Sequence, residues 1–187
     1  MSDREDPGAA VPALALRRYD PRDADAVWRL HELALRDAGT DPADVPGTDD
    51  LRSVETSYLD GDGGFVVGTV PPDAAGSDAP RVHDGALVAM GGFLPSTDGH
   101  DDERTVAGAA ELHRMRVAPS CQRRGYGREL LAALETAVRA AGHDLVLATT
   151  AARQRAAVRF YPVHGYEKTG ESTVAGYELY HFQKRLG

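Results

Sequence analysis

The segment from Glu111 to Arg128 contains the residues whose types and spacing most clearly suggest chemistry. An apolar strand is predicted to end at Val117, and a short loop then leads to Gly125 and Gly127, where a helix is predicted to begin. Glycines let the backbone approach a ligand closely, and the first N–H groups of a helix have no partner within it. With the helix dipole, these groups form an anion site that suits a pyrophosphate.

Arg123, Arg124 and Arg128 add charge-assisted hydrogen-bond donors around this loop. The loop matches neither of the two standard phosphate-binding patterns, because it has no third glycine and no Gly-Lys-Ser/Thr. A tight loop with solvated arginines would give the same spacing. The strand before the loop and the apolar helix after it favour the ligand site.

The elements that must position this segment follow from the apolar pattern. Strands are predicted near residues 14–19, 64–70, 86–94, 109–117, 145–148, 165–170 and 176–185. Helices are predicted from Asp20 to Gly39, around 48–60, from the glycine pair to Gly142, and over 151–161. The sequence therefore predicts an α/β fold: a central mixed, mostly antiparallel sheet of six to seven strands with helices on both faces. Residues 109–149 should form a right-handed strand–helix–strand unit.

Length, charge and cysteine content narrow the class of protein. A chain of 187 residues suits one domain, predicted over 13–187 after a disordered leader at 1–12. The net charge of −8 disfavours nucleic acid and membrane as partners. Cys121, the single cysteine, is expected to be a small residue of a surface loop, and no Cys/His spacing indicates a metal. The first residues lack an apolar run, so a cytoplasmic protein is expected.

The loop resembles a motif of the GNAT acyltransferases. Gln122-Arg123-Arg124-Gly125-Tyr126-Gly127 is similar to the family pattern Gln/Arg-x-x-Gly-x-Gly/Ala, at the family's distance after a strand that ends in Val and a Pro. Asp20–Leu30 resembles the start of the family's first helix, and Phe160-Tyr161 with Gly165-Tyr166 resembles its closing aromatic signature. The resemblance spans residues 14–186, and it implies an acyl-CoA-dependent N-acyltransferase of the GNAT fold.

In such enzymes the loop amides hold the pyrophosphate of acetyl-CoA, and the end of the preceding strand hydrogen-bonds the pantetheine arm through its backbone. Gln154 stands where many relatives have an asparagine that contacts the cofactor. The resemblance thus implies binding of acetyl-CoA by Met115, Arg116, Val117, Gln122, Arg123, Arg124, Gly125, Tyr126, Gly127, Arg128 and Gln154. It also implies direct acetyl transfer, with no metal and no covalent enzyme intermediate.

Tyr161 is the candidate catalytic acid, because it matches the family tyrosine that protonates the departing sulfur. The alternative is a packed aromatic residue whose hydroxyl bonds to the backbone. Pro162 follows directly, and a residue before proline is disfavoured in helical geometry.

Glu111 is the candidate base, since it lies where histone-type members of the family have their catalytic glutamate. Strand alternation predicts Glu111, His113, Met115 and Val117 on one face of the sheet, and Leu112, Arg114 and Arg116 on the other. The alternative is a structural glutamate paired with an arginine such as Arg114 or Arg116, whose pKa would be lowered. A water chain or His113 would then take the proton.

The expected reaction is acetyl transfer to a primary amine of a small molecule or a protein. The alternative is a non-catalytic module that binds acyl-CoA for regulation, and a homodimer is left open. The acceptor is expected to be bound by the helices at 24–60, the loop at 71–85 and the hairpin at 171–176. Carboxylates on these segments would suit a cationic amine, or are solvated surface: Asp41, Asp44, Asp49 and Asp50.

Overall fold

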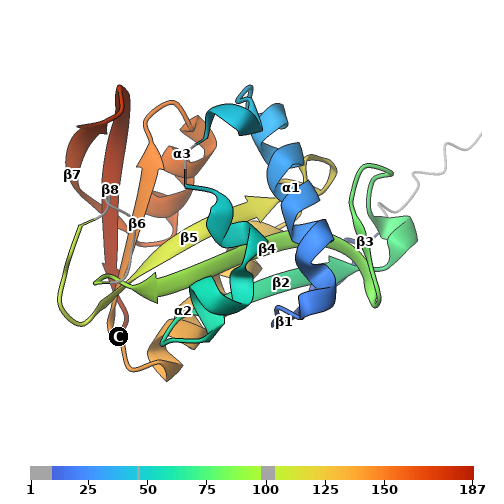
Figure 1. Cartoon of the computed structure of the whole chain (residues 1–187), viewed down its shortest axis with the longest axis horizontal. Helices are drawn as coiled ribbons and strands as arrows, with labels where there is room; N and C mark the ends of the chain where they lie inside the picture. Colours follow the sequence, from blue (N-terminus) through green and yellow to red (C-terminus); the bar gives the residue numbers. More distant parts are fainter. Residues whose placement is uncertain (1–9, 46, 98–103) are drawn as a thin grey trace, which may run out of the picture.

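A computed structural model describes residues 10–45, 47–97 and 104–187. The described strands form a single sheet in the order β1-β2-β4-β5-β6-β8-β7, with β3 paired to β4 (Figure 1). They are β1 Ala15–Arg18, β2 Gly64–Val70, β3 Arg81–Val82, β4 Gly85–Pro95, β5 Ala109–Val117, β6 Leu145–Ala151, β7 Glu167–Val174 and β8 Tyr177–Arg185.

The sheet is mixed and mostly antiparallel, as predicted. The one parallel pair is β5 with β6, and α2 (Tyr126–Ala140) joins these two strands. The predicted leader lies mainly outside the described residues. The structure has one strand more than predicted, the short β3. It was not predicted because a strand of two residues shows no alternation of apolar and polar residues. It lies in the loop that was expected to be irregular.

Helices cover both faces of the sheet. In Figure 1, α1 (Ala24–Asp37) crosses in front of β4 and β5, and α2 lies behind them. α3 (Arg155–Val163) lies on the same face as α2, since Phe160 packs against Gly127. Among the described residues, no helix is both long enough and apolar enough to cross a bilayer.

The start of the first helix follows from its capping residues. The Asp20 side chain accepts a hydrogen bond from the backbone N–H of Arg22, and Asp23 completes a capping box around a 3₁₀ turn, Pro21–Asp23. The helix predicted around 48–60 is wrong in detail. Ser53, with φ −140°, separates a 3₁₀ turn, η3 (Asp49–Arg52), from a π-helical turn, η4 (Glu55–Leu59).

The core lies on both faces of the central strands. The predicted apolar face of α2 is buried: Leu130, Leu131, Leu134 and Val138 are each at most 2% exposed. Burial of such a side chain contributes about 2 kcal/mol to stability. This packing fixes the beginning of α2 against the end of β5, where the candidate site lies.

Candidate functional site

The sheet opens at its centre, between β5 and β6. The two strands pair only from Ala109 with Leu145 to Leu112 with Ala148. Beyond this point β5 continues to Val117 along β4, and β6 continues to Ala151 along β8. We call the space between these unpaired strand ends the wedge. Because an extended chain can add to an open strand edge, the wedge suits an extended ligand.

The backbone of β5 presents alternate residues to the wedge. The N–H of Ala118 donates to Val88 O at 2.8 Å, which turns Ala118 toward β4. Alternation then turns the backbone groups of Val117 and Met115 toward β6, and those of Arg116 toward β4. Arg116 instead reaches the wedge edge through its side chain, which donates from Nη1 to Met115 O at 2.8 Å. This geometry therefore does not support the prediction that the backbone of Arg116 binds the pantetheine arm.

A β-bulge changes which side chains share a face. Arg114 has φ 55°, and the register to β4 shifts opposite it, between Met90 and Gly92. The ring of His113 lies 6.0 Å from that of Tyr58 in η4, on the α1 face. The Tyr161 hydroxyl reaches Met115 Sδ at 3.9 Å, on the α3 face.

The prediction that Glu111 and His113 share a face with Met115 and Val117 is therefore wrong. The bulge inserts a residue into the strand, so the alternation reverses after it. Arg114 lies on the α1 face with Glu111 and His113. Met115 and Val117 lie on the face of α2 and α3.

The turn between β5 and α2 has the geometry of an anion site. Gly125 has φ 90° and precedes the first helical residue, and Arg123 has φ 61°. Both residues are in the left-handed region, which turns the chain from the end of β5 into α2, and the first N–H groups of that helix have no partner within it. A Cβ on Gly127 would lie 3.4 Å from the Phe160 ring, an ordinary contact.

The side chains of the loop divide into exposed and structural groups. Gln122, Arg123 and Arg128 are exposed. Arg124 donates to Ala74 O and Ser120 O, both at 2.9 Å, so it holds the loop against the segment after β2. The Tyr126 hydroxyl donates to Pro12 O at 2.8 Å.

Cys121 is fully buried, so the expectation of a surface-loop residue is wrong. It is the last residue of the 3₁₀ turn η6 (Pro119–Cys121) and packs in the core. A thiol with no exposed surface in this structure is a poor nucleophile toward a dissolved substrate.

Tyr161 is held rigidly beside the wedge. Its ring packs 5.3 Å from Tyr166 and 5.5 Å from Phe182, and 7% of the residue is exposed. Burial raises its pKa to about 12; the charge of Arg116 opposes the shift, and the smaller effect of the Glu111 charge adds to it. α3 continues through Pro162 to Val163, so the expected departure from helical geometry does not occur.

Glu111 lies on the α1 face of β5 and is 1% exposed. Its register partner on β6 is Leu147, two residues before Thr149. Arg114, one of the arginines proposed to pair with Glu111, donates from Nε to Asp50 Oδ2 at 2.9 Å. Whether Glu111 acts as a base remains a prediction.

Asp50 ties the α1 side of the site to β5. It accepts hydrogen bonds from Arg114 and from the Tyr58 hydroxyl. Asp50 was predicted to line the acceptor site, and this pairing makes it a structural residue of η3. No sequence signal connects Asp50 to an arginine 64 positions later, because the contact depends on the bulge.

His31 is a buried polar residue that sequence reasoning missed. It is fully buried in α1, and neither ring nitrogen has a hydrogen-bond partner among the described residues. Burial, followed by the charges of Arg116 and Arg114, lowers its pKa to about 4. His31 lies on the apolar face of α1, a position typical of a core residue, so its unpaired ring nitrogens could not be predicted from the sequence pattern.

Gln154 directly precedes α3, and its Oε1 accepts a hydrogen bond from Thr150 Oγ1 at 2.9 Å. Thr150 lies on β6 beyond the paired region, so Gln154 is near the wedge. In the described part of the chain, no group of three His, Cys, Asp or Glu side chains could hold a metal ion.

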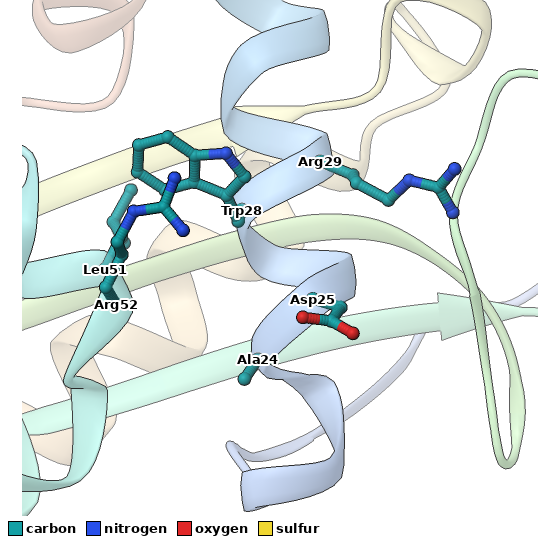
Figure 2. A pocket seen from close by; sticks show the side chains of 6 residues that line it. All are labelled: Ala24, Asp25, Trp28, Arg29, Leu51 and Arg52. Carbon is teal, nitrogen blue, oxygen red and sulfur yellow. The ribbon is translucent and has the colours of Figure 1, made fainter.

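A surface hollow of about 360 Å³ lies between α1 and η3 (Figure 2). The Arg52 guanidinium stacks 3.7 Å from the centre of the Trp28 ring at its rim. The hollow contains none of the predicted catalytic or cofactor residues, which lie on β5, α2 and α3.

Comparison with known proteins places this geometry in a family. Residues 48–166 match the model of the acetyltransferase (GNAT) family. No curated protein sequence matches the chain.

Solved structures share the fold. A GNAT-family acetyltransferase from Staphylococcus aureus Mu50 is 14% identical, with TM-score 0.72 over 94% of this chain and 100% of that one. The protein yncA from Salmonella typhimurium, solved with its cofactor acetyl-CoA, is 20% identical, with TM-score 0.66 over 94% and 95%. Ribosomal-protein-alanine N-acetyltransferase from Brucella melitensis is 21% identical, with TM-score 0.66 over 92% and 99%.

Proposed function

This chain belongs to the GNAT family of acetyltransferases, and we propose that it transfers an acetyl group from acetyl-CoA to a primary amine of a small molecule or protein. The amine attacks the thioester carbonyl directly, with no covalent enzyme intermediate and no metal. The observation that carries this proposal is the wedge, whose open β5 edge leads straight to the left-handed turn and first amides of α2.

The chain's own groups fit the two ends of acetyl-CoA. The first N–H groups of α2, with exposed Arg123 and Arg128 beside them, suit the pyrophosphate. The backbone groups of Met115 and Val117 face the wedge and suit the amides of the pantetheine arm. The Arg116 side chain donates to Met115 O, and the Gln122 side chain donates to Val117 O at 3.5 Å. Both side chains would have to move aside when the ligand binds these carbonyls.

Tyr161 is proposed to protonate the departing sulfur. A phenol whose pKa is about 12 stays protonated at neutral pH, so it is available as a donor. Its hydroxyl already points at a sulfur atom, Met115 Sδ, at 3.9 Å. A thioether is a weak acceptor, so little is lost when the hydroxyl turns to a thiolate.

Glu111 is proposed to take the proton of the amine. It lies on the α1 face of β5, whereas Tyr161 lies on the α3 face, so the acid and base approach the wedge from opposite sides. This arrangement suits attack from one side and departure toward the other. The relative from Brucella acts on a ribosomal protein, and the acceptor here is proposed only as a class, an amine.

The assay that tests this function is thiol release from acetyl-CoA with a panel of amines: a polyamine, an aminoglycoside and a peptide with a free N-terminus. At least one amine should release thiol faster than buffer without amine. Binding of acetyl-CoA with no transfer to any of them would instead favour the non-catalytic module. The rigid packing of Tyr161 argues against that alternative.

A further inference from the structure

A row of hydrogen-bonded side chains crosses the three strands on the far side of the wedge from β5. Thr149 Oγ1 of β6 lies 3.1 Å from His181 Nδ1 of β8. His181 Nε2 lies 2.8 Å from Ser172 Oγ of β7. These strands lie at the left of Figure 1, beyond the part of the sheet that α1 crosses. We call Thr149, His181 and Ser172 the hydroxyl–histidine row.

The row lies on the same face as the proposed base. Thr149 is two residues after Leu147, the register partner of Glu111, so both side chains lie on one face. Thr149 is also the first residue of β6 beyond the pairing with β5, which puts it at the opening of the wedge. Thr149 and His181 are directly opposite in register, so they share that face as well.

The row leads outward from the interior. His181 is 5% exposed, whereas Ser172 is half-buried on β7, the edge strand of the sheet. A neutral imidazole has one N–H and one acceptor nitrogen. Placed between two hydroxyls, it can accept a proton at Nδ1 and release another at Nε2.

A buried base needs such an outlet. Each turnover leaves a proton on Glu111, because Glu111 takes one proton from the ammonium form of the acceptor, whereas the second N–H proton, lost after the attack, replaces the one that Tyr161 gives to the sulfur. A carboxyl group in a residue that is 1% exposed cannot return its proton to bulk water unaided. Resting on the proposed function, we propose that the hydroxyl–histidine row is the route by which this proton leaves the site.

A water molecule in the wedge takes the proton from the Glu111 carboxyl group and passes one to Thr149 Oγ1. Thr149 gives its own hydroxyl proton to His181 Nδ1, His181 Nε2 gives its proton to Ser172 Oγ, and Ser172 releases its hydroxyl proton to solvent water. Rotation of the two hydroxyls and the reverse change of tautomer restore the row.

Among the described residues, His113 and Arg104 are the titratable or charged groups near the row besides Glu111. His113 shares the face on β5. Arg104 reaches β7 and β8, where its guanidinium donates to Thr169 Oγ1 and Phe182 O. Lys168 is opposite Phe182 in register and stacks over Tyr180 at 3.3 Å, so it lies on the other face of the sheet from His181. Because these groups also respond to pH, the rates of the first and later turnovers are compared at one fixed pH.

The test is rapid-mixing kinetics of thiol release by His181→Gln, which keeps hydrogen-bonding capacity and cannot relay a proton. The first turnover should keep its wild-type rate, because Glu111 begins deprotonated. Later turnovers should slow by about 10²-fold, the scale of one lost acid–base step. The trace should show a burst of about one thiol per enzyme, and added imidazole buffer should speed its slow phase.

Two further variants keep the test independent of folding. Ser172→Ala, at the half-buried end, and Thr149→Val should show the same burst in a protein that still unfolds cooperatively, with a melting temperature lowered by a few degrees because each loses one hydrogen bond to His181. Thr173→Ala, at the exposed neighbouring position on β7, should show none.

If variants of the row fold but slow the first and later turnovers equally, or slow neither, the row is not the exit route of the proton. A wild-type protein that transfers acetyl to no amine would instead overturn the proposed function itself.

Discussion

At Tyr161, two effects act on the same hydroxyl. Burial raises its pKa to about 12, while the positive charge of Arg116 stabilises the phenolate and limits the rise. Because the pKa is raised, the hydroxyl is a proton donor at every pH below about 12. Any fall in rate between pH 8 and 10 must therefore come from another group.

Tyr161→Phe should lower turnover by about 10²- to 10⁴-fold and leave the affinity for acetyl-CoA nearly unchanged, since only a transition-state donor is lost. Steady-state kinetics and calorimetry on the same sample check both numbers. Tyr166→Phe is a matched control, because that hydroxyl donates to Glu135 on α2. Unchanged turnover in Tyr161→Phe would return Tyr161 to a packing role.

Glu111→Gln should reduce the rate most at low pH. At high pH the amine increasingly arrives neutral, so the deficit should shrink as pH rises. If Glu111 is structural, the variant should instead lose thermal stability and show a deficit that does not recover with pH. A pH–rate profile and a melting temperature separate the two. A stable variant with a pH-independent deficit would contradict both, and would direct attention to His113 or water.

At the scale of elements, the sequence predicted the strands and helices that carry the site, because their apolar periodicity is strong. It failed at Arg114, where a bulge reverses the alternation of β5. A bulge is set by the pairing with β4, so no local pattern at residues 111–117 reveals it. The ion pair of Asp50 with Arg114 was missed for the same reason.

The cofactor loop shows the same limit. The motif identified Arg123, Arg124 and Arg128 alike as donors, since spacing alone does not distinguish a solvated arginine from a clamped one. Only the tertiary structure places Ala74 beside Arg124.

Arg124→Ala should therefore destabilise the fold. It removes two hydrogen bonds to backbone carbonyls, which should cost about 1–3 kcal/mol and lower the melting temperature by about 5 °C. Arg123→Ala changes an exposed side chain of the same loop and should stay within about 0.5 kcal/mol of wild type. Chemical denaturation of both variants makes the comparison. Equal stability of the two would mean that the Arg124 clamp contributes nothing.

At the scale of the whole molecule, the sheet arranges the site by opening at its centre. The parallel pair β5–β6 separates after four residue pairs, and different layers line the resulting wedge on its two faces. On one face lie the anion site at the start of α2 and Tyr161 of α3. The α1 face brings Glu111, His113 and the start of the hydroxyl–histidine row.

The central claim is that acetyl-CoA binds in this wedge with its pyrophosphate at the start of α2. Thermal unfolding with acetyl-CoA tests it most directly, because a ligand that binds only the folded state raises the melting temperature. At 100 times the dissociation constant the gain is about 2.7 kcal/mol, or about 5–10 °C for a chain of this size.

Gly127→Glu should abolish the shift, because it puts a negative charge where the pyrophosphate must lie. Gly127→Ala, whose Cβ fits at ordinary contact distance from Phe160, should retain most of it. We predict a shift in wild type, a similar shift in Gly127→Ala and none in Gly127→Glu. No shift in wild type at millimolar acetyl-CoA, or an undiminished shift in Gly127→Glu, would contradict the account.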